Sequence, residues 1–184
     1  MWTQRLTEQF VKDGVVTPED AEIVRYGLEA LADNILAFLL TTIVGFFYGS
    51  LLSGIVLWML IFPLRKYAGG YHAKTKVQCY LISVGMLVVA FALLYQPAYH
   101  PTVHFILVAF SGSYIFMNAP VDHKNKVLDM TERRVYRKRT RIVLILERIL
   151  FVIVWLLGLG NLVAVIAMCF GIVGISLTMG KHCC

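Results

Sequence analysis

One histidine and one cysteine stand seven residues apart in a polar segment that separates two apolar stretches of this 184-residue chain. The segment reads RKYAGGYHAKTKVQC and places His72 before Cys79. A cysteine attacks as its thiolate, and an imidazole, which titrates near neutral pH, is the usual group that accepts the thiol proton. The pair therefore indicates either a thiol active site or an ordinary basic loop that contains both residues.

Helix geometry limits how the two residues can meet. A straight α-helix over residues 72–79 would separate them by two turns, about 10.5 Å along its axis. A hydrogen bond between imidazole and thiol needs about 3 Å. A catalytic pair thus requires a break in the helix, and Gly69-Gly70 supplies the flexibility for it. We expect Cys79 near the start of the next helix, where the helix dipole and nearby basic residues favour the thiolate.

The apolar stretches on either side of this segment are typical of a membrane protein. The chain is 59% hydrophobic and only 15% charged, whereas a soluble domain has about 25% charged residues. No Asp, Glu, Lys or Arg occurs in residues 35–64, 77–121 or 149–180, and a bilayer core is crossed by about 20 apolar residues. We predict an all-α, polytopic integral membrane protein of about six transmembrane or re-entrant helices plus an N-terminal amphipathic helix.

The apolar segments form one membrane domain over residues 32–180, followed by a short tail at 181–184. The six segments are predicted at 33–49, 51–64, 79–95, 102–119, 142–158 and 162–180. The first two, joined at Gly49-Ser50, are also compatible with a re-entrant hairpin, which would leave four full spans. We expect no ionisable residue in the middle of the membrane.

The N-terminal region, residues 1–31, is predicted to be cytoplasmic and helical. Trp2, Leu6 and Phe10 recur every four residues in a short amphipathic helix that ends at Gly14. This helix lies either on the membrane surface or against the protein's own cytoplasmic face. A second helix is expected to start near Thr17-Pro18 and to continue into the membrane.

Basic residues alternate with uncharged turns along the chain. The loops predicted at 65–78 and 120–141 are rich in Lys and Arg, whereas the turns at 49–50, 96–101 and 158–161 contain neither. By the positive-inside rule, both basic loops and both termini are cytoplasmic. The net charge of +6 therefore fits a chain oriented by the positive-inside rule and in contact with lipid headgroups. We do not expect nucleic acid as a partner.

Two motifs resemble one known family. Arg65…Gly69-Gly70-Tyr71-His72…Cys79 is similar to the signature of the accessory gene regulator B (AgrB) family, and APVDHKNK at residues 119–126 is similar to a second family element. Members of that family are membrane cysteine endopeptidases of Gram-positive bacteria that process precursors of quorum-sensing peptides. The resemblance implies a multi-pass protein of the bacterial cell membrane.

The resemblance also implies a reaction. The thiolate of Cys79 would attack a peptide carbonyl of a small amphipathic precursor, with His72 as base and later as acid. The C-terminal tail would leave, and a Cys or Ser of the peptide would close a thiolactone or lactone on the resulting thioester. We expect no cofactor and no metal. A homodimer is expected only from the general habit of proteins to form two-fold dimers.

Other residues have supporting roles with alternatives. Arg65 could position a carboxylate or line an oxyanion site, or it could anchor the loop, and Gly70 belongs to the turn. Asp122 could orient His72, or it could pair with Arg65 or Lys124. Four basic residues are candidates for binding the acidic tail of the precursor, or for fixing orientation on anionic lipid: Lys124, Lys126, Arg133 and Arg134.

Two other classes of protein remain open. A small transporter or sensor subunit would function without Cys79 and His72 and would place ionisable residues along a pathway in mid-membrane. A membrane acyltransferase would use the same thiol on a fatty acyl group. Cys169 is expected to serve in packing, and a metal site at His100 and His104, four residues apart, is disfavoured because no Cys or carboxylate accompanies them.

Overall fold

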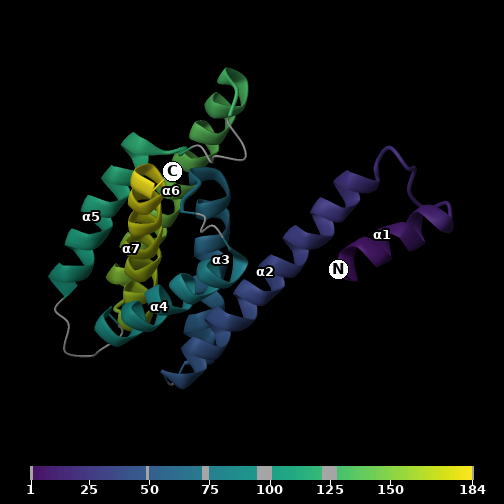
Figure 1. The fold of residues 1–184 in the computed structure, drawn as a ribbon. Coiled ribbons are helices and arrows are strands. Elements are labelled where there is room, and N and C mark those ends of the chain that lie inside the picture. Colours follow the sequence, from purple (N-terminus) through teal and green to yellow (C-terminus); the bar gives the residue numbers. More distant parts are fainter. Residues whose placement is uncertain (1, 49, 72–74, 95–100, 122–127, 184) are drawn as a thin grey trace. The chain divides into compact units, whose positions relative to one another are not determined.

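The protein is all-helical over the residues that its computed structural model describes, which are 2–48, 50–71, 75–94, 101–121 and 128–183. Seven helices and no strand occur in these ranges, which confirms the predicted fold class (Figure 1). The helices are α1 Trp2–Lys12, α2 Ala21–Phe47, α3 Leu51–Ala68, α4 Lys76–Leu94, α5 Pro101–Asn118, α6 Met130–Leu156 and α7 Gly160–Cys183.

Four of these helices are long and apolar enough to cross a membrane within the described ranges: Ala21–Phe47, Leu51–Ala68, Lys76–Leu93 and Gly160–Lys181. The apolar part of α5, Thr102–Asn118, is shorter. Because α2 and α3 each reach the required length, the helices favour two separate spans over the re-entrant hairpin. The prediction of a membrane protein agrees with this set of helices.

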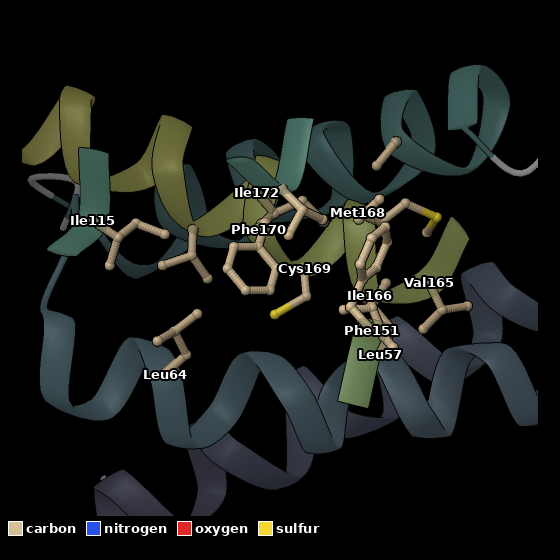
Figure 2. Packing of buried hydrophobic residues seen from close by; sticks show 14 of the residues in the cluster. Leu57, Leu64, Ile115, Phe151, Val165, Ile166, Met168, Cys169, Phe170 and Ile172 are labelled. Atoms are coloured by element: carbon tan, nitrogen blue, oxygen red, sulfur yellow. The ribbon is translucent and has the colours of Figure 1, made fainter. Parts of the chain in front are cut away.

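Helix α7 forms the centre of the membrane domain. It contacts α3, α4, α5 and α6, which surround it in Figure 1. Its side chains are buried from Val163 to Gly174, as expected for a helix that is apolar on all sides. Figure 2 shows Met168, Cys169 and Phe170 of α7 packed among Leu57 and Leu64 of α3, Ile115 of α5 and Phe151 of α6.

Helices α2 and α3 approach each other closely near the turn that joins them. A Cβ on Gly45 would lie 2.7 Å from the Cα of Gly54, and a Cβ on Gly54 would lie 2.7 Å from the carbonyl oxygen of Thr41. Ser50 caps α3, since its Oγ accepts the backbone N–H of Ser53 at 3.2 Å. Two glycines thus allow backbone contact between neighbouring apolar helices.

The chain divides into two compact units, one up to Leu40 and one from Thr41 onward. In the first unit, α1 ends before Gly14, which has φ of 70°. Oγ1 of Thr17 accepts the N–H of Asp20, as expected of a capping residue, and α2 begins at Ala21, three residues after the predicted start. Thr3 and Thr7 are buried, whereas Trp2 is 59% exposed, so the tryptophan faces away from the packed side of α1.

Helix α6 begins twelve residues earlier than the fifth apolar segment was predicted to begin. Asp129 and Glu132 form a reciprocal capping box at its N-terminus, with Oδ1 of Asp129 accepting the N–H of Glu132. The predicted loop 120–141 is therefore helical from Met130 onward. Hydropathy alone misplaced this boundary, because the basic first half of the helix does not count as apolar.

Candidate active site

Cys79 lies in the first turns of α4. Its N–H donates to the carbonyl oxygen of Thr75 at 3.1 Å, and Oγ1 of Thr75 accepts the N–H of Gln78 at 3.3 Å. The thiol is half-buried and is not part of a disulfide. The expected position near a helix start is confirmed, and a helix N-terminus favours a thiolate.

Thr75, directly before α4, is not helical, which agrees with the requirement that a Cys–His pair cannot lie on one straight helix. Helix α3 ends at Ala68 and α4 begins at Lys76, so residues 72–79 do not form one straight helix. Four of the predicted site residues lie outside the described ranges: His72, Asp122, Lys124 and Lys126.

The two glycines after α3 adopt conformations that suit glycine. Gly69 has φ of 78° and Gly70 has φ of 154°, both in the region that side-chain-bearing residues avoid. A Cβ on Gly69 would lie 2.6 Å from the carbonyl oxygen of Val121, and one on Gly70 would lie 2.6 Å from Oγ of Ser176. The glycine pair therefore provides both the turn and the space for close packing.

Two groups hold Tyr71, which directly precedes His72 in the sequence. Nη2 of Arg65 donates to the carbonyl oxygen of Tyr71 at 3.2 Å. The N–H of Tyr71 donates to the carbonyl oxygen of Ser176 at 2.9 Å and lies 3.3 Å from the Oγ of Ser176. Arg65 thus contacts the turn itself, which agrees with the anchoring alternative. A role of Arg65 in positioning a carboxylate or lining an oxyanion site stays a prediction.

The two sequence motifs meet in space. The N–H of Val121 donates to the carbonyl oxygen of Ala68 at 3.1 Å, and Ala119 and Pro120 are buried beside it. Nζ of Lys181 donates to Oδ1 of Asn118 at 2.8 Å. The C-terminal ends of α3, α5 and α7 therefore come together at the candidate site.

Basic side chains of α6 contact aromatic rings of α3 and α5 at the same end of the domain. The guanidinium of Arg139 stands over the ring of Tyr67 at 5.4 Å, and that of Arg141 over the ring of Phe116 at 4.3 Å. Arg133 is half-buried and Arg134 is exposed in the first two turns of α6. The structure thus places both candidate tail-binding arginines on a helix that extends from this end.

The expectation of no ionisable residue in the middle of the membrane overlooked two residues of the segment predicted at 142–158. Glu147 and Arg148 lie in α6 inside the segment predicted at 142–158, and Glu147 is only 5% exposed. The thiol of Cys169 donates to Oε2 of Glu147 at 3.8 Å, while Nη2 of Arg148 donates to Oγ of Ser113 at 3.3 Å. Neighbouring helices supply polar partners, which allows ionisable groups inside an otherwise apolar bundle.

Cys169 is buried in α7, as its predicted packing role requires. It has the additional hydrogen bond to Glu147, which the sequence did not indicate. The described residues contain no group of three or more His, Cys, Asp or Glu side chains arranged to hold a metal ion. His104 is buried in α5, and His100 lies outside the described ranges.

Sequence reasoning did not identify Ser176 and Gly180 as part of this region. Both lie on α7, more than a hundred residues from the glycine pair that they contact. Their spacing of four residues is a small-xxx-small pattern, which marks close approach in membrane helices. That pattern was the available signal, but nothing in the sequence showed which backbone would approach it.

These features define a polytopic helical membrane protein with a candidate thiol site at one end of its bundle. The family model of accessory gene regulator B matches residues 3–179, and the chain belongs to that family. The resemblance read from the two motifs is therefore confirmed.

Relatives of the chain include AgrB-like proteins from two genera. AgrB-like protein 2 of Clostridium perfringens (strain 13 / Type A) is 29% identical over 142 residues, which cover 73% of this chain and 65% of the relative. An AgrB-like protein of Listeria monocytogenes serotype 4a (strain HCC23) is 32% identical over 119 residues, which cover 63% and 57%. The chain thus spans less than two thirds of the length of these relatives. No solved structure gives a significant match.

Proposed function

We propose that this protein is a membrane cysteine endopeptidase that removes the C-terminal tail of a small amphipathic precursor of a cyclic signalling peptide. The observation that carries the proposal is the position of Cys79. Its free thiol lies in the first turns of α4. The glycine turn that precedes α4 in the chain is held at Tyr71 by Arg65 and by Ser176 of α7. Membership of the accessory gene regulator B family supports the same assignment.

The first step forms a thioester. His72 accepts the thiol proton, and the sulfur of Cys79 attacks the carbonyl carbon at the junction between peptide and tail. The C–N bond breaks, and His72 returns its proton to the amine of the leaving tail. The peptide is then held as an acyl group on Cys79.

The second step closes the ring. His72 accepts the proton of a Cys thiol or Ser hydroxyl within the peptide, whose sulfur or oxygen attacks the thioester carbonyl, and the Cys79 thiolate leaves and takes that proton back from His72. A thioester retains enough acyl-transfer potential for this exchange, provided that water is kept away from it. The half-buried setting of Cys79 supports such protection. The product is a thiolactone or lactone, and the enzyme is regenerated.

Co-expression with a candidate precursor tests the proposal. We expect the wild-type protein to release the C-terminal tail, and we expect Cys79→Ser and His72→Ala to lower the rate by at least about 1,000-fold. Tail release and the amount of folded membrane protein are measured in the same samples. Undiminished cleavage by folded Cys79→Ser would exclude the proposed mechanism.

The covalent adduct on Cys79 separates this proposal from a membrane acyltransferase. We expect mass spectrometry of the trapped protein to show a peptide on Cys79. A fatty acyl chain in its place would assign the thiol to lipid chemistry.

We further propose that the basic first turns of α6 attract an acidic tail of the precursor. Arg134 is exposed there, and further basic residues follow along the helix. Because exposed charges act mainly by long-range attraction, we expect Arg134→Ala to raise KM by about threefold at low salt, with kcat unchanged. Arg5→Ala, on α1, is the control. A fall in kcat without a change in KM would contradict this role.

A further inference from the structure

Two small residues of α7 form a seat for the glycine turn. Ser176 and Gly180 are four residues apart, so they lie on the same face of the helix. Both are buried. The seat contacts backbone atoms of Gly70 and Tyr71, the last described residues before His72.

Gly180 allows the turn to reach the carbonyl of Ser176. A Cβ at position 180 would lie 2.8 Å from the carbonyl carbon of Gly70 and 3.0 Å from the N atom of Tyr71. These are backbone atoms, which cannot rotate away as the end of a flexible side chain can. A helical Cβ points back toward the preceding turn, so any side chain at 180 would occupy the space that the Gly70–Tyr71 peptide fills.

Ser176 supplies the hydrogen bonds of the seat. Its carbonyl oxygen accepts the N–H of Tyr71 at 2.9 Å, and its Oγ lies 3.3 Å from the same nitrogen. On the other side of the turn, Arg65 donates to the carbonyl oxygen of Tyr71. Both backbone polar groups of Tyr71 are therefore held, one by α7 and one by α3.

We infer that Ser176 and Gly180 are positioning residues of the proposed endopeptidase: together they fix the chain that delivers His72 toward Cys79. This inference rests on the proposed function. A loop that has one fixed backbone point next to a catalytic base presents that base in a restricted range of positions. Displacement of reacting groups by about 1 Å can lower a rate by about 100-fold.

The test compares Gly180→Ala with a matched glycine of the same helix. Gly171 is also buried in α7, but the atoms nearest to a Cβ there would be the Cδ atoms of Leu107, at 3.3 and 3.6 Å, which are the flexible end of a side chain. We expect Gly180→Ala to lower kcat for tail release by about 100-fold, and we expect Gly171→Ala to stay within about threefold of wild type. Equal losses in the two variants would overturn the inference in favour of general packing.

A second readout separates positioning from folding. The rate of alkylation of Cys79 by iodoacetamide is followed against pH in the full-length protein, with the modified peptide quantified by mass spectrometry. We expect the pH profile of Gly180→Ala to move toward that of His72→Ala, because both separate imidazole from thiol. A wild-type profile in folded Gly180→Ala would refute the positioning role, since a loss of folded protein lowers amplitude without moving the profile.

Ser176→Ala keeps the test decisive if Gly180→Ala does not fold. Alanine fits the space of serine and retains the backbone carbonyl, so we expect a smaller loss of kcat, about fivefold. Thr178→Ala is its control, because the Thr178 hydroxyl donates to Gly174 within α7 and the side chain is exposed. An unchanged kcat in Ser176→Ala with an unchanged pH profile would show that the Ser176 hydroxyl has no positioning role, since the variant removes only that hydrogen bond.

Failure of this inference is distinct from failure of the proposed function. If Cys79→Ser and His72→Ala abolish tail release while Gly180→Ala and Ser176→Ala behave as wild type, only the seat is wrong. If folded Cys79→Ser still releases the tail, the endopeptidase proposal itself is wrong.

Discussion

Gly69 shows how a single residue connects the two sequence motifs. Its positive φ of 78° turns the chain after α3. It has no side chain, and a Cβ at this position would lie only 2.6 Å from the carbonyl oxygen of Val121. The sequence predicted flexibility at this glycine pair. It did not predict that the second motif would pack against it, because contacts between residues more than fifty positions apart leave no local pattern.

Substitution of Gly69 is expected to destabilise this junction. Gly69→Ala places a residue with a Cβ at φ 78° and ψ −161°, a region that is essentially restricted to glycine and costs about 1–3 kcal/mol, and it creates a close contact with the backbone of Val121. We expect a lower melting temperature in detergent and reduced tail release. Gly85→Ala in α4 is the control, since nothing lies within 4 Å of its Cβ position and alanine favours the helix. A melting temperature for Gly69→Ala equal to that of Gly85→Ala would contradict the contact.

The pair formed by Glu147 and Cys169 is a second feature at the residue scale. Among the described residues, Oε2 of Glu147 accepts the thiol of Cys169, and Oε1 has no hydrogen-bond partner. A buried acceptor that loses its donor is destabilising by about 1–3 kcal/mol, whereas replacing both partners by apolar groups is close to neutral. The pair is therefore suited to a double-mutant cycle.

We expect Cys169→Ala alone to destabilise the bundle by about 1–3 kcal/mol. Glu147→Leu should be more favourable in the Cys169→Ala background than in the wild type, because it removes the acceptor left without a donor. Unfolding in detergent, followed by circular dichroism for all four proteins of the cycle, measures the coupling. Additive effects would show that the hydrogen bond does not contribute to stability.

At the scale of elements, helix type was predictable and helix ends were not. The number and order of the apolar helices followed from the charge-free gaps and the turns within them, whereas α2 begins at Ala21, three residues after the start that Thr17-Pro18 indicated. Helix α6 was predicted too short, because its first three turns carry basic residues that hydropathy excludes. The capping box at Asp129 and Glu132 was visible in the sequence and marks the true start.

The contact between α2 and α3 depends on Gly45 and Gly54, whose backbones approach too closely for side chains. We expect Gly45→Leu to separate the helices and to lower stability by about 1–3 kcal/mol. The measurement is the melting temperature of the purified protein in detergent, with Gly85→Leu as a control on an open surface of α4. Equal melting temperatures of the two variants would contradict close packing of this helix pair.

At the scale of the whole molecule, basic residues gather at one end of the membrane domain. The ends of α3, α5 and α7 are joined there by Val121 to Ala68 and by Lys181 to Asn118. Arg139 and Arg141 of α6 contact aromatic rings of α3 and α5. The turn between α6 and α7, at the other end of both helices, has no Lys or Arg.

We predict that the basic end faces the cytoplasm, because positive residues are retained on that side of a bacterial membrane. Met130, which is 89% exposed at the start of α6, and Leu159, which is 45% exposed in the turn after it, are suitable reporter sites. On intact cells, a membrane-impermeant maleimide should label Leu159→Cys and should label Met130→Cys only after permeabilisation. Labelling is quantified at each site by mass spectrometry, so the native cysteines stay in place. The reverse pattern would place the thiol of Cys79 on the outside, where an endopeptidase could not meet a precursor before its export.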